Sequence, residues 1–356
     1  MSASEDTPTS PGPLVIGAQG SFAAGGTVVI TPGVFDPVHP TDPAGQTLHG
    51  DHVRVSYQIP ADALALPLVL WHGYGVDGTC WDTTPDGREG FRDIFLRRRR
   101  AVYILDQPRR GAAAKTTVAA EVTTATMEQM WYTQFRFGVW PGFFPGGQFP
   151  ADPAAVEQFF RSMVPDTGPI DTEVIVSGVS AAFDRIGPSV MVMHSHAGGF
   201  AWLTAIRNRN VKAVIGLEPG SGFVFPEGEV PPPTDSGTGP LAGVPIPVDD
   251  FEQLTCIPIV LYYGDNIPTE RHEVAGLDNW RVRWQMAGAF VDTINLHGGD
   301  AKLVSLPEIG ITGNSHFAFA DLNNRQIADQ LSQFLTEKRL DEGTVSNKPD
   351  PRGSDE

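Results

Sequence analysis

The sequence predicts an α/β protein, a doubly wound and mostly parallel sheet with an inserted cap. Short apolar runs alternate along the chain with longer helix-like segments, which is the pattern of strands joined by crossover helices. Within residues 188–206 an apolar run ends abruptly in a tight turn, and a helix-like segment follows directly. The chain has no internal repeat, and its 356 residues suit one large domain with insertions or two ordinary domains.

The expected elements follow from these runs in chain order. The expected strands are apolar or alternating runs bounded by turn residues: 27–31, 51–58, 67–71, 101–105, 189–193, 212–216, 258–263 and 302–306. The expected helices lie between or after them: 89–98, 152–163, 171–184, 199–208, 278–289 and 324–338. Crossover connections in such a sheet are right-handed, and ligands bind at the carboxyl ends of its strands. Functional residues are therefore sought where strands end.

Two segments interrupt this alternation. Residues 127–150 are dense in aromatic side chains and contain several glycines, so they form either satellite core or, as we favour, a cap over an apolar pocket. Residues 219–250 are rich in Pro and Gly and too long for an ordinary connection, which predicts a functional or mobile loop.

The domain limits follow from composition. We expect one folded domain over residues 14–340, with the cap inserted at about 122–170. The two ends, 1–13 and 341–356, are polar and rich in Pro or Gly, so both are expected to be disordered.

Charge and hydropathy exclude two classes of partner. The formal net charge is −17, so nucleic acid and anionic membrane surfaces would be repelled. No apolar stretch approaches the length of a membrane span. We expect no nucleic-acid partner and no membrane partner.

The first residues and the cysteines bear on the compartment. The chain begins with a polar, acidic segment that has neither the basic nor the apolar region of an intact signal peptide. Cys80 and Cys256 allow at most one internal disulfide, and free buried thiols are the favoured interpretation. The cytoplasm is therefore expected, with a secreted protein that has lost its signal as the alternative.

Ser195 stands at the apex of the turn His194-Ser195-His196. A serine between a strand and a helix is typical of the nucleophile elbow of α/β-hydrolases, where the turn lifts the hydroxyl above the sheet. The usual flanking glycines are replaced by Met193 and Ala197. The competing interpretation is an ordinary buried strand-to-helix turn, so the choice depends on downstream partners.

A serine nucleophile needs a general base, and His316 has the best position. It follows the last expected strand and precedes the final helix, in a loop at the carboxyl ends of the strands. His272 lies in a charged loop that is expected to be solvated. His297 precedes the last strand and is therefore expected at the opposite edge of the sheet.

Two carboxylates compete for the role of the acid that orients the base. Glu218 ends the strand at 212–216, and Asp265 ends the next strand, at 258–263. Both side chains would project from strand ends toward the site, and spacing does not separate them.

The turn Trp71-His72-Gly73-Tyr74-Gly75 follows the strand at 67–71 directly and predicts the oxyanion hole. Its glycines allow close approach of the backbone, with the Tyr74 N–H as one donor. The second donor would be the N–H of His196, after the nucleophile. The histidine pair around Ser195 has no third ligand nearby in sequence, so a zinc site is rejected.

Together these motifs resemble a divergent group of bacterial α/β-hydrolase serine esterases. The resemblance runs from about residue 20 to 338. It rests on segments in addition to the turns above: 81–91, 106–111, 148–150, 165–169, 217–219 and 313–317. It implies Glu218 as the triad acid, ester hydrolysis without metal or organic cofactor, and commonly a homodimer. The chain departs from the group in having no intact signal peptide and few cysteines.

We therefore expect a serine hydrolase that cleaves carboxylic esters through an acyl-enzyme. Its substrate is expected to have an apolar or aromatic portion, bound by Trp131, Phe135 and Trp140 of the cap. The alternatives are a lactonase that uses the same residues, an acyltransferase, and a catalytically silent binding protein with this fold. Small esters are the expected partners, and no metal site is expected.

Overall fold

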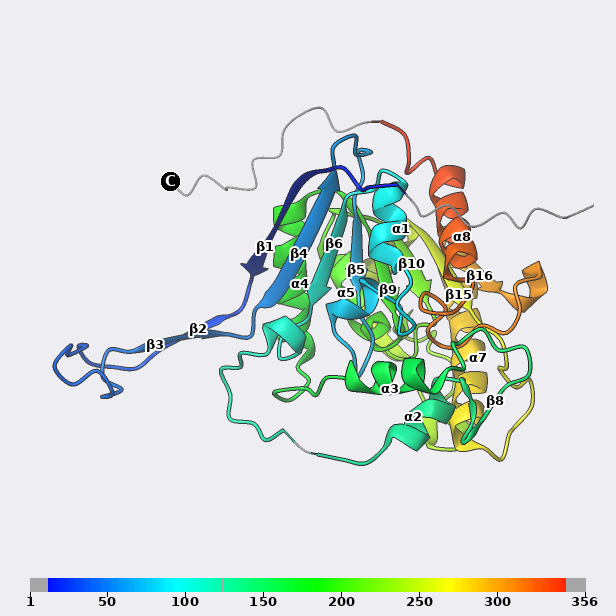
Figure 1. Ribbon diagram of the computed structural model, residues 1–356, viewed down its shortest axis with the longest axis horizontal. Helices are drawn as coiled ribbons and strands as arrows, with labels where there is room; N and C mark the ends of the chain where they lie inside the picture. The colour runs from blue at the N-terminus through cyan, green and yellow to red at the C-terminus, as the bar shows by residue number, and fades with distance from the viewer. Residues whose placement is uncertain (1–11, 123, 344–356) are drawn as a thin grey trace, which may run out of the picture.

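A computed structural model of the protein describes residues 12–122 and 124–343. Its centre is an eight-stranded sheet (Figure 1), in which β1 and β4 are antiparallel to their neighbours and the other strands run parallel. The order across the sheet is β1 (Ile16–Ala24), β4 (Val53–Pro60), β6 (Val102–Asp106), β5 (Leu68–Trp71), β9 (Ser189–His194), β10 (Val211–Leu217), β15 (Pro258–Tyr263) and β16 (Asp300–Ser305). The expected doubly wound, mostly parallel sheet is present.

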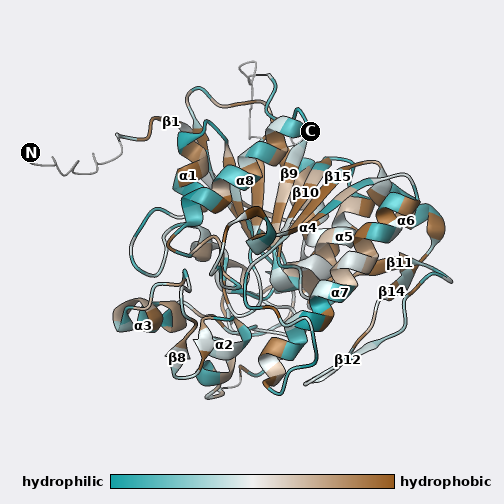
Figure 2. Cartoon of the chain, turned by 90° about the vertical axis from the view of Figure 1, so that its right-hand side faces the viewer, coloured by the Kyte–Doolittle hydropathy of each residue, from teal (hydrophilic) through white to brown (hydrophobic). Residues whose placement is uncertain are grey.

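Helices cover both faces of this sheet. One face carries α4 (Thr172–Ile186), α5 (Gly198–Arg207), α6 (Val248–Thr255) and α7 (Ala275–Leu296); the other carries α1 (Phe91–Arg97) and α8 (Asn324–Glu337). Alternate residues of a strand point to opposite faces, and in β5 Val69 packs with the first group while Leu70 packs with the second. Figure 2 shows the hydrophobic strands enclosed between these layers.

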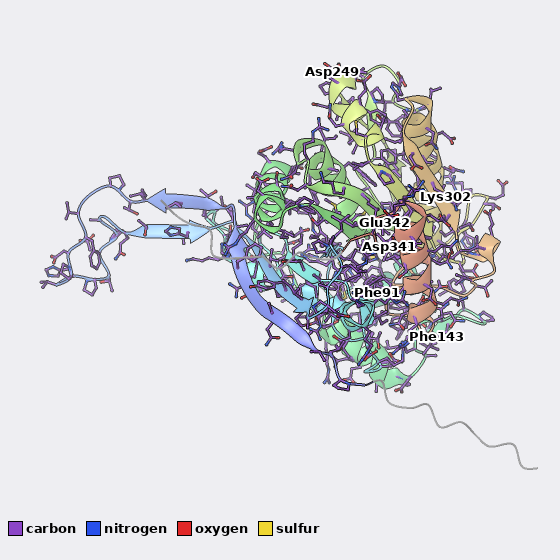
Figure 3. The ribbon with its side chains drawn as sticks, turned by 90° about the horizontal axis from the view of Figure 1, so that it is seen from above. Phe91, Phe143, Asp249, Lys302, Asp341 and Glu342 are labelled. Carbon is purple, nitrogen blue, oxygen red and sulfur yellow. The ribbon has the colours of Figure 1, made fainter. Side chains whose placement is uncertain are left out.

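The amino-terminal region differs from the expectation. The strand expected at 27–31 is β2 (Thr27–Ile30), which pairs with β3 (Thr47–Gly50) in a hairpin separate from the main sheet. This hairpin, the arm of residues 27–50, projects from the body (Figures 1 and 3). The edge strand β1 was not predicted, because its sequence is rich in Gly and Ala and one of its faces is exposed.

The segment expected to form a cap contains α2 (Glu128–Gln134), β7 (Gly138–Val139), β8 (Gly142–Phe143) and α3 (Pro153–Arg161). Part of its aromatic set is core: Tyr132, Phe135, Phe137 and Phe149 are buried. Met127, Met130 and Trp140 are exposed, so the segment has an apolar inner side and a partly apolar outer side. The short helix α2 was not predicted, because its aromatic residues do not repeat with a clear helical period.

The long loop expected at 219–250 is more structured than its composition suggests. Two small sheets lie within it: β11 (Val224–Pro226) with β14 (Val244–Ile246), and β12 (Thr234–Ser236) with β13 (Gly239–Leu241). The helix expected at 278–289 is longer in the structure, where α7 begins at Ala275 and ends at Leu296. Short 3-10 helices complete the described secondary structure: η1 (Gly78–Trp81), η2 (Gly111–Ala113), η3 (Ser195–Ala197) and η4 (Pro307–Ile309).

The remaining structural expectations concern the ends, the thiols and the membrane. Most of the two segments expected to be disordered, 1–13 and 341–356, lies outside the described residues. Cys80 and Cys256 are free thiols, and Cys256 is exposed rather than buried as expected. Within the described part of the chain, no helix has both the length and the apolar character that crossing a membrane requires.

Candidate active site

The turn after β9 has the geometry of a nucleophile elbow. Ser195 follows the strand directly, begins η3 and has a φ of 55°, a left-handed conformation that non-glycine residues adopt only under constraint. Glycines in the elbow and on β10 allow the neighbouring segments to approach closely. A Cβ on Gly198 would come within 2.9 Å of Pro219 Cβ, and a Cβ on Gly216 would come within 2.9 Å of Met193 Cε. Gly216 of β10 thus accommodates the methionine that replaces the usual first glycine of the elbow.

Three side chains form one hydrogen-bonded chain at the carboxyl ends of the strands. Ser195 Oγ lies 2.8 Å from His316 Nε2, and His316 Nδ1 lies 2.6 Å from Glu218 Oε2. His316 comes from the loop between β16 and α8, and Glu218 follows β10 directly. Both His316 and Glu218 are buried, so the contacts are shielded from solvent. The structure therefore brings together the predicted serine, histidine and glutamate.

The competing carboxylate, Asp265, serves a different part of the same loop. Its Oδ2 accepts a hydrogen bond from the Gly313 N–H at 2.8 Å, and its Oδ1 accepts one from the Asn266 N–H at 2.6 Å. Asp265 thus fastens the segment that leads to His316 without contacting the imidazole. The structure separates two residues that sequence spacing left equivalent.

Arg136 is the site residue that the sequence analysis missed. Its buried guanidinium donates through Nη2 to Glu218 Oε1 and through Nε to the Asp265 carbonyl oxygen, at 2.8 Å for the latter. It also lies over the ring of Trp280, 4.8 Å from the centroid. Glu218 Oε1 also accepts a hydrogen bond from the Gly264 N–H at 2.6 Å. One sequence signal was available, since Arg136 is the only basic residue within 127–150.

These contacts set the protonation states of the pair. Burial alone would raise the pKa of Glu218, but the charge of Arg136 and the hydrogen bond from His316 outweigh it and lower the pKa to about 2. Burial lowers the pKa of His316 to about 4, with smaller lowering effects from Arg136 and Arg283 against the opposing effect of Glu218. At neutral pH the histidine is neutral and the glutamate is ionised, the states that a general base and its orienting acid require.

The turn after β5 lies against the nucleophile. A Cβ on Gly73 would come within 2.5 Å of His194 Nδ1 and 3.0 Å of Ser195 Cβ, so only glycine allows this approach. The next residue is Tyr74, whose N–H has no hydrogen-bond partner among the described residues. The Tyr74 ring meets the His196 ring edge-on at 5.8 Å. The two predicted oxyanion donors are therefore on segments that flank Ser195.

The buried guanidinium of Arg110 holds this turn by a hydrogen bond to its backbone. It donates to the Gly73 carbonyl oxygen at 3.0 Å, pairs with Asp166 and lies over the Tyr74 ring at 4.9 Å. Arg110 and Asp166 belong to the segments 106–111 and 165–169 that carried the family resemblance. Their contacts explain what those segments do, which is to fix the turn that precedes Tyr74.

The predicted substrate-binding aromatics separate into two groups. Phe135 stacks on the imidazole of His316, with centroids 5.7 Å apart, and Trp131 lies beside the Tyr74 ring at 5.3 Å. Trp131 and Tyr74 also line a cavity of about 700 Å³, together with residues of the segments 119–128 and 160–169. Trp140 does not belong to this group, because it is 47% exposed and lines a separate cavity on the outer side of α2 and α3. The expectation that Trp140 lines the substrate site was therefore wrong.

His194, which precedes the nucleophile, contacts the loop that carries the base. His194 Nε2 lies 2.9 Å from the His316 carbonyl oxygen, and burial lowers the pKa of His194 well below its usual value. Among the residues the structure describes, no three or more His, Cys, Asp or Glu side chains are grouped to hold a metal ion.

The sheet order, the elbow at the end of β9 and the covering helices define the class of protein: the chain has the α/β-hydrolase fold. Among solved structures it is similar to a novel bacterial esterase, with 29% sequence identity and a TM-score of 0.74 over 93% of this chain and 99% of that one. Among curated proteins it is similar to the probable secreted lipase phiG of Fungal sp. (strain ATCC 74256), 29% identical, with 76% of this chain and 81% of the lipase covered. No family model matches the chain.

Proposed function

We infer that this protein is a carboxylic ester hydrolase that works through an acyl-enzyme on Ser195. One observation carries the inference: the buried contact chain from Ser195 Oγ through His316 to Glu218. The similarity to a bacterial esterase and to a fungal lipase, each over most of the chain, supports the same reaction.

The proposed mechanism uses each contact of this chain. Ser195 Oγ attacks the ester carbonyl carbon while His316 Nε2 takes the hydroxyl proton. The carbonyl oxygen, now negative, accepts hydrogen bonds from the Tyr74 and His196 N–H groups. The tetrahedral intermediate collapses, and His316 returns the proton to the departing alcohol. Water then attacks the acyl-serine by the same steps and releases the carboxylic acid, while Glu218 stabilises the imidazolium.

The substrate is proposed to be a small ester with an apolar or aromatic portion. The cavity beside Tyr74 has room for such a group, and Trp131, Met163 and Phe160 supply apolar lining. The Phe135 ring stacks on the His316 imidazole. The Phe135 carbonyl oxygen also accepts a hydrogen bond from the backbone N–H of His316 at 2.8 Å. The cap segment thus shapes the site and fixes the base together.

Hydrolysis of p-nitrophenyl acetate, butyrate and benzoate by the wild type and by Ser195→Ala tests this proposal. Removing the nucleophile is expected to lower kcat by roughly 10⁴- to 10⁶-fold while the melting temperature stays close to that of the wild type. A folded wild type without turnover of any ester would contradict the proposal and favour a silent binding protein. Turnover that survives in Ser195→Ala would contradict the role of Ser195.

We also propose that the protein forms a homodimer through the arm of residues 27–50. An isolated two-stranded hairpin is marginally stable in water, yet the arm exposes apolar side chains, among them Val28, Ile30, Val34 and Val38. A second copy of the same arm would cover them in a twofold arrangement. Light scattering after size exclusion should give a dimer for the wild type and a monomer for Val28→Lys with Ile30→Lys. A monomeric wild type would contradict the arrangement.

The compartment stays a prediction. The composition of the first residues favours the cytoplasm, whereas the curated relative is named as a secreted lipase. Fractionation of the native host with an antibody to the protein distinguishes the two compartments.

A further inference from the structure

Two arginines on α7, two residues apart, have opposite surroundings. Arg281 donates to Asp278 through Nε at 2.6 Å, and this ion pair is largely buried. Arg283 forms no ion pair with any carboxylate of the described residues; its Nη1 donates at 2.8 Å to the carbonyl oxygen of Asn279, one turn earlier. Its guanidinium also lies 5.4 Å from the centroid of the Trp280 ring. Arg283 is therefore a cation whose remaining donors are not occupied by an acid.

Arg283, which has no carboxylate partner, lies close to the nucleophile Ser195. A Cβ on Gly220 would lie 3.5 Å from Arg283 Nε and 3.7 Å from Ser195 Oγ. Gly220 therefore lies beside both the guanidinium and the nucleophile, and a Cβ at this position would be in ordinary van der Waals contact with each. Gly220 itself is fixed by its N–H, which donates to the Ser195 carbonyl oxygen at 3.0 Å. The electrostatic effect of Arg283 on His316 also places its charge close to the reacting groups.

The electrostatics close to Arg283 differ from those of the chain as a whole. The chain carries a formal net charge of −17, which repels anions at long range, but the Debye length is about 8 Å at physiological ionic strength. Within that distance a partly desolvated guanidinium outweighs exposed acids on distant surfaces. A guanidinium also binds a carboxylate with two parallel hydrogen bonds, which a neutral ester group does not match.

We propose that Arg283 is a specificity-determining residue that binds a carboxylate on the substrate, so that the preferred esters are half-esters of dicarboxylic acids. The proposal rests on the ester hydrolase function proposed above and specifies its substrate class. The scissile carbonyl lies at Ser195 and the free carboxylate lies at Arg283, with the spacer between them passing Gly220, which has no side chain. Hydrolysis releases the dicarboxylic acid and the alcohol.

Matched pairs of substrates test this assignment. Mono-p-nitrophenyl succinate, glutarate and adipate are compared with the same compounds carrying a methyl ester in place of the free carboxylate. The wild type is expected to favour at least one free acid over its methyl ester by about tenfold or more in kcat/KM. A single hydrogen bond between charged partners accounts for a preference of about this size. Arg283→Gln should remove this preference, by lowering kcat/KM for the free acids about tenfold more than kcat/KM for their methyl esters.

Two further variants separate binding from structural effects. Arg283→Lys keeps the charge and should keep part of the preference, although it loses the two-point contact. Arg207→Gln removes the same formal charge from an exposed pair with Glu173 and should leave the preference unchanged.

Three results would overturn the assignment. A wild type that hydrolyses both members of every pair equally would overturn it while leaving the ester hydrolase function intact. An equal loss on both substrates in Arg283→Gln would show a structural role. A wild type inactive on all of these esters would overturn the proposed function and this inference with it.

Discussion

The ends of β10 and β15 are neighbouring strand ends that each carry a carboxylate, Glu218 and Asp265, but they do different work. Glu218 is buried, contacts the imidazole of His316 and pairs with Arg136. Asp265 is partly exposed and accepts backbone N–H groups from Asn266 and Gly313. Both residues act on the same histidine loop, one on the side chain of the base and the other on the backbone that carries it.

Two features distinguish Glu218 from Asp265 as the acid of this site. Glu218 has a φ of 49°, a left-handed conformation that is uncommon outside glycine, and its side chain contacts the imidazole carried by the loop after β16. Arg136, from the segment after α2, then reaches the second carboxylate oxygen. The position of the acid thus depends on a backbone conformation and on a distant arginine, in addition to the strand end it follows.

Replacement of the two carboxylates gives the largest expected contrast. Glu218→Gln keeps the shape of the side chain but removes the charge that stabilises the imidazolium, so kcat should fall by about 10⁴-fold. The fall is measured with p-nitrophenyl butyrate at pH 7. Because this variant leaves Arg136 buried without an anion, the double variant Glu218→Gln with Arg136→Met is the control. Recovery of activity in the double variant would assign the loss to the stranded cation instead.

Removal of Arg136 alone tests whether the arginine selects the acid. Arg136→Met should lower kcat by about ten- to a hundredfold, because a hydrogen bond to a charged group is lost beside the base. Without the nearby cation, His316 binds a proton more readily, so the acid limb of kcat/KM should move to higher pH. A lower rate with an unchanged acid limb would mean that Arg136 acts only on folding of the cap segment.

The pH profile of the wild type examines the same pair without mutation. His316 must be neutral to accept the serine proton, so the rate falls as pH decreases through its pKa. Burial, together with Arg136 and Arg283, lowers that pKa to about 4, whereas an ordinary histidine titrates near 6.5. We expect kcat/KM to stay nearly constant from pH 7 down to about pH 5. A half-maximal value near pH 6.5 would contradict the burial of the base.

The smallest effect is expected at Asp265. Asp265→Asn keeps one acceptor oxygen, so one of the two backbone N–H groups, that of Asn266 or that of Gly313, stays bound. The kcat should remain within about tenfold of the wild type, and unfolding should become easier by about 1 to 2 kcal/mol. Thermal denaturation measures the second quantity. If Asp265→Asn rather than Glu218→Gln abolished turnover, the assignment of the acid would be wrong.

Local sequence patterns predicted most of the fold for a physical reason. The buried strands β5, β9, β10 and β15 are continuous apolar runs, since both faces of a parallel sheet are covered. The edge strand β1 and the arm lack this signal, because their side chains are exposed and their pairing depends on tertiary context. The strand expected at 27–31 was therefore taken for part of the main sheet, and the second strand of the arm, β3, was not predicted.

The site was predictable where a residue follows a strand and unpredictable where contacts come from distant segments. Ser195 directly follows β9 and His316 lies in the loop after the last strand, so chain order located both; it left Glu218 and Asp265 equivalent, and the family resemblance favoured Glu218. Arg136 contacts Glu218 across 82 positions of sequence, and nothing in its local pattern reports that distance. Trp140 lies in the same aromatic segment as Trp131 but is exposed. The chain after α2 reverses direction at β7 and β8, and local sequence does not report this reversal.

The central claim is that Ser195 is a nucleophile activated by His316 and held by Glu218. Labelling with a fluorophosphonate, followed by mass spectrometry of the intact protein and of its peptides, tests it most directly, because the reagent reacts with activated serines whatever the natural substrate. The account predicts one label per chain on the peptide containing Ser195 in the wild type, and no label in Ser195→Ala or His316→Ala. An unlabelled wild type, or a label that persists in Ser195→Ala, would contradict the account.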